Sequence, residues 1–310
     1  MQNPKIHMLP SIWHSAMLRE IDVSSLMDTD TNIPEESLIN FLQAENDLPS
    51  PTPFITWNNP NYPSFLKRQP KAPPVLFYRG NLSLLTERVI GIVGTRKCTQ
   101  NGRNMARQIA SVINQAGLCT ISGLAYGIDK TVHLSSLSKT IGILPCGFSS
   151  ITSPQIQTLT QTILEQNGLI LSEFLPHHPP RKWRFIRRNR LIAWLAEEIV
   201  IVEAPPKSGA LHTAQFALEA GQSLWAVPCS PLQNTGAGCL NLIQAGARPL
   251  CNLKQFAFHL GISYTEKEIF NVSEFAQKLN LNETQALRIL MKKVIDGQIK
   301  TLSNGYYQWI

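Results

Sequence analysis

Short apolar runs rich in β-branched residues alternate with longer amphipathic stretches through the middle of the chain, starting at residue 88. The runs predict strands, and they read RVIGIV, LCTI, TIGIL, LILS, IVIVEA and SLWAVP. The stretches between them predict helices around residues 102–116, 127–138, 155–166, 187–195 and 210–220. Continuous apolar strands that alternate with helices are typical of a parallel sheet covered on both faces. The pattern therefore predicts an α/β fold built on a parallel sheet.

The two flanks of this region have different patterns. Residues 1 to about 50 have weak helical periodicity and run into PSPTPFITWNNPNYPSFLKRQPKAPP, whose prolines predict an extended connector. Beyond about residue 255, NVSEFAQKLN and NETQALRILMKKVIDGQ predict two short helices, and IKTLSNGYYQWI predicts a hairpin. We therefore expect a small helical N-terminal unit with its linker at 1–53, a sheet domain at 54–255 and a winged-helix domain at 256–310.

Composition and charge narrow the function classes. The 310 residues include 28 Lys and Arg against 21 Asp and Glu, a net charge of +7 that favours a polyanionic partner. The six cysteines form no CxxC pair and no histidine cluster has metal-ligand spacing, so we expect neither a metal site nor a redox motif. We find no long apolar run and no signal-peptide pattern, so we expect a cytoplasmic protein without a membrane segment.

The loops that follow the predicted strands carry the candidate chemistry. In a parallel sheet with right-handed crossovers these loops meet at one edge, where ligands bind. The first loop, GTRKCTQNGR, lacks the fingerprints of dinucleotide-binding and P-loop sites, which argues against NAD and ATP. What it offers is a turn with two cations ahead of a helix, and helix starts favour phosphate. The loops ISGLAYGID and EAPPKSGA offer further small residues ahead of helices, so we expect a groove that takes several phosphates.

A basic segment, RKWRFIRRNR at residues 181–190, has six cations in ten positions and no acid. Trp183 and Phe185 are interleaved with the cations, and this combination suits a nucleic-acid strand, because cations follow phosphates while rings stack on bases. The alternative is a solvated basic face, or arginines paired with acids such as Glu197, Glu198 and Glu203. Pairing suits Arg188 and Arg190 best, since the apolar residues that follow them indicate partial burial.

Catalytic groups are sparse in these loops. Asp129 and His133 lie four residues apart on a predicted helix, where a capping aspartate is a commoner explanation than an acid/base pair or half a metal site. No Ser-His-Asp order or paired-carboxylate site is evident, so we expect no enzyme activity. The alternative is a nucleotide phosphoribohydrolase-like enzyme with Glu203 or Asp129 as its acid, although a mononucleotide pocket does not explain six adjacent cations.

A series of motifs between about residues 54 and 252 resembles the DNA-processing protein A family, DprA or Smf. These motifs are YPSFLKRQPKAPPVLFYRGN, IGIVGTRKCTQNG, TISGLAYGIDKTVH, GLILSEFLP, FIRRNRLIAWLAEEIVIVEAPPKSGALHTAQFALEAG, WAVPC and GAGCLNLIQAGA. The resemblance implies an extended Rossmann-like fold followed by a winged helix. It also implies a homodimer that binds single-stranded DNA, protects incoming strands and loads the recombinase RecA onto them in natural transformation, without a cofactor or an established catalytic activity.

The resemblance also assigns a DNA pocket, residue by residue, wherever the motif positions match. The implied nucleic-acid-binding residues are Gly94, Thr95 and Arg96 of the first loop, Ser122 and Gly123 of the loop ISGLAYGID, Lys182, Phe185, Arg188, Asn189 and Arg190 of the basic segment, and Ser208 and Gly209 of the loop EAPPKSGA.

Overall fold

The computed structural model describes residues 52–69, 72–136, 139–263, 269–296, 298–301 and 305–309. The helical unit predicted for residues 1–53 lies outside the described residues, apart from its last two positions. The chain divides into two compact units, the first ending at Leu260 and the second beginning at Gly261.

A nine-stranded sheet, counted over the described residues, forms the centre of the larger unit, with the order β1-β2-β6-β5-β4-β3-β7-β8-β9. The strands are β1 (Phe54–Thr56), β2 (Val75–Gly80), β3 (Val89–Val93), β4 (Cys119–Ser122), β5 (Thr140–Ile143), β6 (Leu169–Ser172), β7 (Glu198–Ile201), β8 (Ser223–Ala226) and β9 (Arg248–Pro249). Every pair from β6 to β9 is parallel, which confirms the predicted α/β fold. Strands β3 to β7 are fully buried, as their uninterrupted apolar sequences predict.

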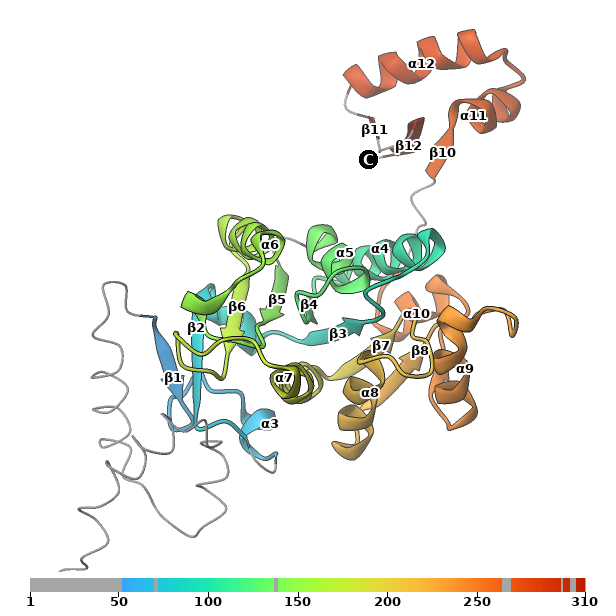
Figure 1. Cartoon of the computed structure of the whole chain (residues 1–310). Coiled ribbons are helices and arrows are strands. Elements are labelled where there is room, and N and C mark those ends of the chain that lie inside the picture. Colours follow the sequence, from blue (N-terminus) through green and yellow to red (C-terminus); the bar gives the residue numbers. More distant parts are fainter. Residues whose placement is uncertain are drawn as a thin grey trace, which may run out of the picture. The chain divides into compact units, whose positions relative to one another are not determined.

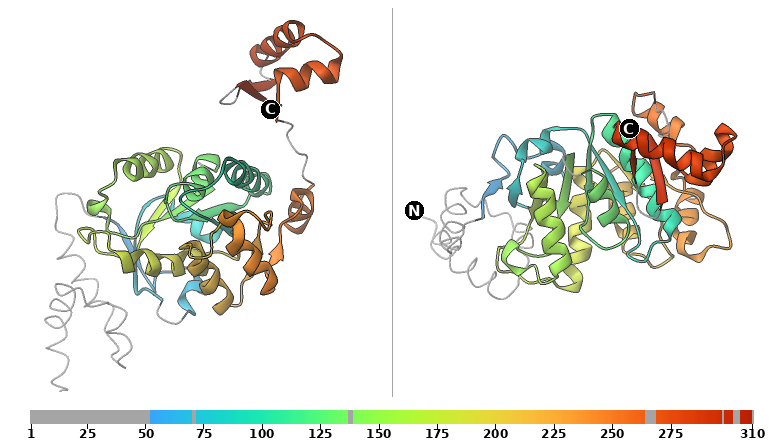
Figure 2. Two further views of the ribbon diagram at one scale, coloured as in Figure 1. Left: turned by 45° about the vertical axis from the view of Figure 1, so that its right-hand side comes forward. Right: turned by 90° about the horizontal axis from the view of Figure 1, so that it is seen from above.

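Helices cover both faces of the sheet (Figures 1 and 2). On one face lie α4 (Gln100–Gln115), α5 (Ile128–Ser135) and α6 (Pro154–Glu165), and on the other lie α7 (Lys182–Leu195) and α8 (Ala210–Glu219). The shorter helices are α3 (Ser64–Lys67), α9 (Ala237–Gln244) and α10 (Leu253–His259). The crossovers change face between the neighbouring strands β3 and β7, so this fold has its topological switch point there.

The proline-rich passage is more ordered than the sequence predicts. Instead of an extended connector over the surface, its described part forms β1 and α3 and leads directly into β2, and β1 and β2 extend the sheet in antiparallel fashion. Its prolines stand outside both strands, Pro53 directly before β1 and Pro74 directly before β2, where a missing backbone donor is tolerated. The short apolar stretches that follow Pro53 and Pro74 are therefore free to pair at the edge of the sheet.

The smaller unit has two helices, α11 (Val272–Leu279) and α12 (Glu283–Ile295), and a three-stranded antiparallel sheet in its described part. The strands are β10 (Ile269–Asn271), β11 (Ile299–Thr301) and β12 (Tyr306–Trp309), in the order β10-β12-β11. Both helices begin with a capping box, formed by Asn271 with Glu274 and by Asn282 with Gln285. The two predicted helices and the hairpin strands are present, and the winged-helix assignment stays a prediction.

Within the described part of the chain, no helix combines the length and the apolar character that crossing a bilayer requires.

Candidate nucleic-acid interface

A cavity of about 610 Å³ lies at the carboxyl ends of β3 and β7, at the switch point of the sheet. The end of β3 and the loop after it form one side with residues 93–97, and Pro205 with residues 207–210, beyond β7, forms another. Phe185, Arg188, Asn189 and Ile192 form a row on α7 that lines the cavity, and Ile186 of the same helix also belongs to the lining. The spacing of three and four residues keeps this row on one face of the helix.

Arg188 forms the charged floor of this cavity. Its guanidinium donates to the carbonyl oxygens of Gly123 and Ile143, the latter at 2.8 Å, and its Nε donates to Asn189 Oδ1 at 3.0 Å. These carbonyls follow β4 and end β5, so Arg188 ties α7 to the carboxyl end of the sheet. Burial lowers the pKa of Arg188 to about 10, which leaves the side chain charged at neutral pH.

Gly123 is required by this contact rather than by a ligand. A Cβ atom at Gly123 would lie 2.5 Å from the Arg188 guanidinium, so a larger residue would displace it. Ser122 is fully buried and donates to the Ile92 carbonyl at 2.6 Å. These two predicted site residues therefore support the cavity from behind and do not line it.

Arg96 and Phe185 form a stacked pair in the cavity lining, with the guanidinium carbon 5.0 Å from the ring centroid. The Thr95 amide donates to the Glu203 carbonyl at 2.7 Å, which fixes the turn that carries Arg96. Gly127 has a φ of +78°, and a Cβ atom there would lie 2.4 Å from the Thr95 carbonyl oxygen, so the two loops pack closely only with glycine. The pair offers both a cation and an aromatic face, the two surfaces on which bases stack.

On the β7 side, Ser208 and Gly209 precede the first turn of α8. Ser208 Oγ accepts the Ala210 amide at 3.3 Å, and the Gly209 carbonyl accepts from Asn189 Nδ2 at 3.1 Å. Lys207 lines the cavity beside them, as Lys97 does on the β3 side. Among the described lining residues the cations are Arg96, Lys97, Arg188 and Lys207, against the single acid Asp129. This charge balance favours a polyanion over a neutral ligand.

Asp129 is committed to the fold, and His133 lies apart from the cavity. The Asp129 Oδ2 atom accepts the amides of Gly123 at 3.2 Å and Ala125 at 3.4 Å, and burial raises the pKa of this carboxyl although Arg188 opposes the shift. His133 is fully buried with Nδ1 2.8 Å from Thr140 Oγ1, and burial lowers its pKa to about 3. The ring of His133 is therefore held by Thr140 in the core and does not line the cavity.

The basic segment is helical over nearly its whole length, because α7 begins at Lys182, ahead of the helix start predicted around residue 187. A helix distributes consecutive side chains around its axis, so the six cations do not form one surface. Lys182 is exposed outside the cavity lining. Arg184 is 1% exposed, donates to the Pro179 carbonyl at 2.5 Å and lies over the rings of Phe174 and Trp183.

Arg187 and Arg190 share one carboxylate. Arg187 Nε lies 3.0 Å from Glu173 Oε2, and Arg190 Nη2 binds the same oxygen. Arg190 also lies over the Trp194 ring, 5.0 Å from its centroid, and it does not line the cavity. Glu173 was not among the acids that the sequence suggested as partners.

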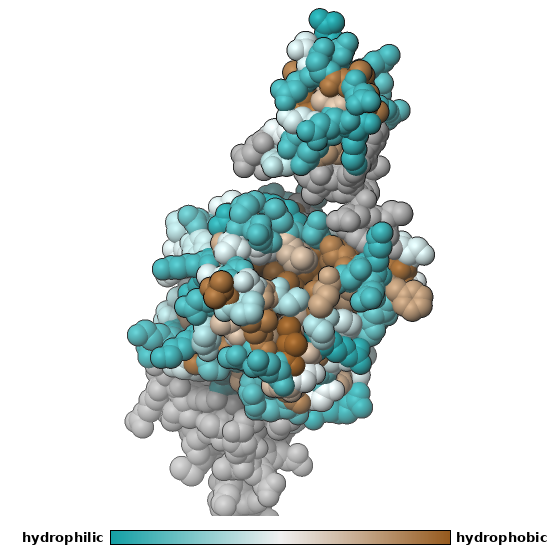
Figure 3. Space-filling view, turned by 90° about the vertical axis from the view of Figure 1, so that its right-hand side faces the viewer, coloured by the Kyte–Doolittle hydropathy of each residue, from teal (hydrophilic) through white to brown (hydrophobic). Residues whose placement is uncertain are grey.

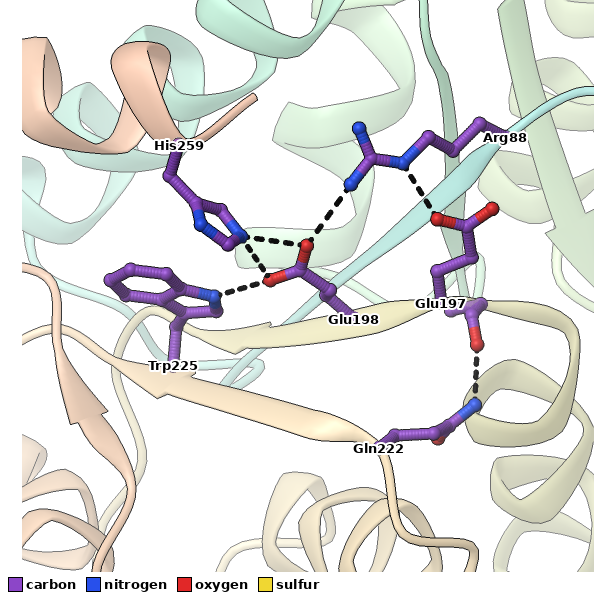
Figure 4. Close-up of polar contacts among 7 residues, drawn as sticks. Arg88, Glu197, Glu198, Gln222, Trp225 and His259 are labelled. Carbon is purple, nitrogen blue, oxygen red and sulfur yellow. Dashed lines mark hydrogen bonds and ion pairs between the residues drawn. The ribbon is translucent and has the colours of Figure 1, made fainter. Parts of the chain in front are cut away.

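The three acids suggested from the sequence have other donors. Glu197 binds Arg88 at 2.6 Å, and Glu198 accepts from Arg88, from Trp225 Nε1 at 2.6 Å and from His259 Nε2 at 2.9 Å (Figure 4). This cluster surrounds the start of β7, the end of the strand away from the cavity. Glu203 accepts from the amide and hydroxyl of Thr99 at 3.0 Å, where α4 begins.

Eight of the twelve predicted site residues line one cavity, namely Gly94, Thr95, Arg96, Phe185, Arg188, Asn189, Ser208 and Gly209. The other four, Ser122, Gly123, Lys182 and Arg190, lie outside its lining. Lys97 and Lys207 belong to the lining and were not predicted as site residues. Their position directly beside Arg96 and Ser208 in the same loops was the available signal.

Comparison with known proteins decides the family. A family model described as DNA recombination-mediator protein A matches residues 53–261. The chain belongs to this family. It is 40% identical to Protein Smf of Synechocystis over 215 residues, 67% of this chain and 54% of that protein. It is 36% identical to DNA processing protein DprA of Bacillus subtilis over 219 residues, 68% of this chain and 73% of that protein. The match thus spans about half to three quarters of these relatives.

Solved structures of family members have the same fold. DNA processing protein A from Streptococcus pneumoniae superposes with a TM-score of 0.65 at 27% identity, covering 84% of this chain and 94% of that one. DNA processing protein A from Helicobacter pylori superposes with a TM-score of 0.61 at 29% identity, covering 69% of this chain and 98% of that one. The H. pylori structure is described as giving insight into a single-stranded DNA binding mode.

Proposed function

We propose that this DprA-family chain binds single-stranded DNA in the cavity at the carboxyl ends of β3 and β7, and that it does so without catalysis. The observation that carries the proposal is the Arg96–Phe185 pair in a lining whose other cations are Lys97, Arg188 and Lys207. Cations hold the sugar-phosphate chain while the ring and guanidinium stack on bases, so the binding needs no duplex. The single-stranded DNA binding described for the H. pylori relative supports the same ligand class.

The distribution of acids supports a binding protein over a phosphoribohydrolase-like enzyme. Such an enzyme needs a carboxyl group that reaches its substrate. Glu203 is 4% exposed, binds Thr99 and is not part of the described cavity lining, while Asp129 holds the loop amides of Gly123 and Ala125. Release of free base from nucleoside monophosphates, lost on replacing either acid, would contradict this part of the proposal.

Family membership extends the proposal to the role of the DNA. We propose that the chain protects incoming single strands and loads RecA onto them during recombination in natural transformation. The relatives from B. subtilis and S. pneumoniae carry the name DNA processing protein DprA, which fits this role. A direct check is the rate at which RecA forms filaments on strands coated by single-strand-binding protein, with and without this chain.

We also propose that the chain acts as a homodimer, as the family resemblance implies. Hydrophobic residues gather on the side of the larger unit that Figure 3 shows. Among the exposed apolar side chains of this unit, Phe258 on α10 is 84% exposed and Leu232 is 96% exposed. Large exposed apolar groups are typical of protein interfaces. Sedimentation at micromolar concentration should give a dimer, and a monomer would remove this part of the proposal.

Binding of a fluorescent oligothymidylate tests the proposed DNA site. Replacing Arg96, Lys97 and Lys207 together with alanine should weaken binding by roughly two orders of magnitude, about 3 kcal/mol. The matched control replaces Arg88, Lys139 and Lys254 with alanine, which removes the same charge outside the cavity lining. The control should bind like the wild type. Equal losses in both triple variants would mean that net charge, and not the cavity, holds the DNA.

A further inference from the structure

Glu173 lies one residue after β6, and its side chain is only 2% exposed. Its Oε2 atom accepts from Arg187 Nε at 3.0 Å and from Arg190 Nη2. These arginines are three positions apart on α7, so a single carboxylate holds two neighbouring turns of one helix. The other oxygen, Oε1, is buried and accepts no hydrogen bond from the described residues.

The arginines held by Glu173 and the cavity row occupy opposite sides of α7. Successive helical residues are rotated by about 100°, which places Arg187 and Arg190 roughly half a turn from Phe185 and Ile192. The rotation of α7 about its own axis therefore decides whether Phe185, Arg188 and Asn189 reach the cavity. A contact on the side of α7 opposite to the cavity can fix this rotation, and so affect the site, without touching a ligand.

Other charged and titratable groups surround the same carboxyl group. Arg184, Arg187 and Arg190 face it from α7, and Tyr62, whose hydroxyl donates to the Pro73 carbonyl at 2.6 Å, lies near it from the segment before α3. Burial raises the pKa of Glu173 to about 7, although Arg190 and Arg184 oppose the shift. The charge on this carboxyl group therefore changes near neutral pH, while the arginines stay protonated.

We propose that Glu173 is a positioning residue for nucleic-acid binding, which holds Arg187 and Arg190 so that α7 presents Phe185, Arg188 and Asn189 to the cavity. This inference rests on the proposed DNA site and adds a residue that does not touch the DNA. It predicts that the negative charge of Glu173 increases the affinity for DNA, although a negative charge ordinarily repels a polyanion. It also means that Arg187 and Arg190 fix the orientation of α7 and do not contact DNA phosphates.

The test is Glu173→Gln, with Glu197→Gln as the matched control. Glutamine keeps the size of the side chain and removes its charge, and Glu197 is a 56% exposed carboxylate bound to Arg88 outside the cavity lining. If only long-range electrostatics mattered, both variants would bind oligothymidylate slightly more tightly. We expect Glu173→Gln to bind roughly tenfold more weakly, about 1.4 kcal/mol, and Glu197→Gln to match the wild type. Unchanged or tighter binding by Glu173→Gln overturns the proposal.

Two further readouts separate positioning from general loss of structure. The weakening caused by Glu173→Gln should combine non-additively with that of Phe185→Ala, because the first acts through the placement of the second. It should also be larger at about pH 8 than at about pH 6, since wild-type Glu173 is itself partly neutral at the lower pH. Additive losses, or a loss independent of pH, would indicate a structural effect alone.

Amide hydrogen exchange in the absence of DNA tests the contact independently of the proposed function. Glu173→Gln should raise exchange in α7 and leave α4 and α5 unchanged. Unchanged exchange in α7 would overturn the positioning role even if DNA binding holds. The remaining outcome is that Glu173→Gln raises exchange in α7 while the wild-type protein binds no oligothymidylate. That outcome would overturn the proposed DNA site but would support the contact between Glu173 and α7.

Discussion

The two ends of β7 place charged residues in opposite arrangements. At its amino end, Glu198 accepts from Arg88, Trp225 and His259, so cations and carboxylates satisfy one another (Figure 4). Beyond its carboxyl end, Lys207 lines a cavity whose other charged residues, in the part of the chain that the structure describes, are three cations and one acid. The same residue types thus stabilise the fold at the amino end of β7 and leave an excess of positive charge beyond its carboxyl end. Local pairing, and not the number of cations, distinguishes a structural cluster from a candidate binding site.

The largest expected difference between the ends concerns stability. Arg188→Met would leave the buried Asp129 without its nearby cation and two carbonyl groups without their donor. We expect a loss of about 3–5 kcal/mol in the free energy of unfolding, since a buried charge loses its compensation. Glu197→Gln, at the exposed pair of the amino end, should cost less than about 1 kcal/mol. Urea denaturation measures the free energy of unfolding of both variants. Equal losses in the two variants would contradict the difference proposed between the two ends of β7.

A smaller effect is expected from Phe185 and Phe65, two of the rings that carry a cation. Phe185→Ala should weaken oligothymidylate binding by ~1–3 kcal/mol, because a base loses its stacking surface. Phe65→Ala is the matched control, since Arg68 lies 5.9 Å from the Phe65 ring centroid outside the cavity lining. It should leave affinity unchanged. If both variants lose the same affinity for oligothymidylate, the DNA does not bind specifically in the cavity.

The smallest effect on binding is expected from His133, which bonds Thr140 at the amino end of β5. The pKa of His133 is lowered to about 3 by burial, from an ordinary value of 6.5. Its neutral form therefore contributes stability above pH 6.5 that is lost as the pH falls toward 3. His133→Leu should make the free energy of unfolding less pH-dependent across this range, while DNA affinity at neutral pH stays the same. An unaltered pH profile would contradict the role assigned to the ring.

The sheet was predictable because its strands are continuous apolar runs, and all six predicted runs became strands. Strands β1 and β2 were missed because runs of three and six residues directly after a proline give no periodic signal, and the pairing of β2 depends on the distant strand β6. The segment 1–53 lies outside the described residues except for its last two.

The site was predictable only in part. Loop position at the sheet edge and the family motifs indicated eight residues of the cavity lining. The burial of Arg184 and the pairing of Arg187 and Arg190 with Glu173 were not predictable, because charge density along the sequence contains no information about which side of α7 meets which loop. A basic segment on a helix has to be divided by its helical phase before its cations are assigned to a ligand.

The salt dependence of oligothymidylate binding tests the central claim most directly. Each cation that contacts a phosphate of a single strand contributes ~0.7 to the slope of log K against log salt concentration. The slope of the variant lacking Arg96, Lys97 and Lys207 should therefore be shallower than that of the wild type by about 2. The variant lacking Arg88, Lys139 and Lys254 should keep the wild-type slope. If the cavity variant keeps the wild-type slope instead, these three side chains do not contact the DNA, and the account of the cavity is wrong.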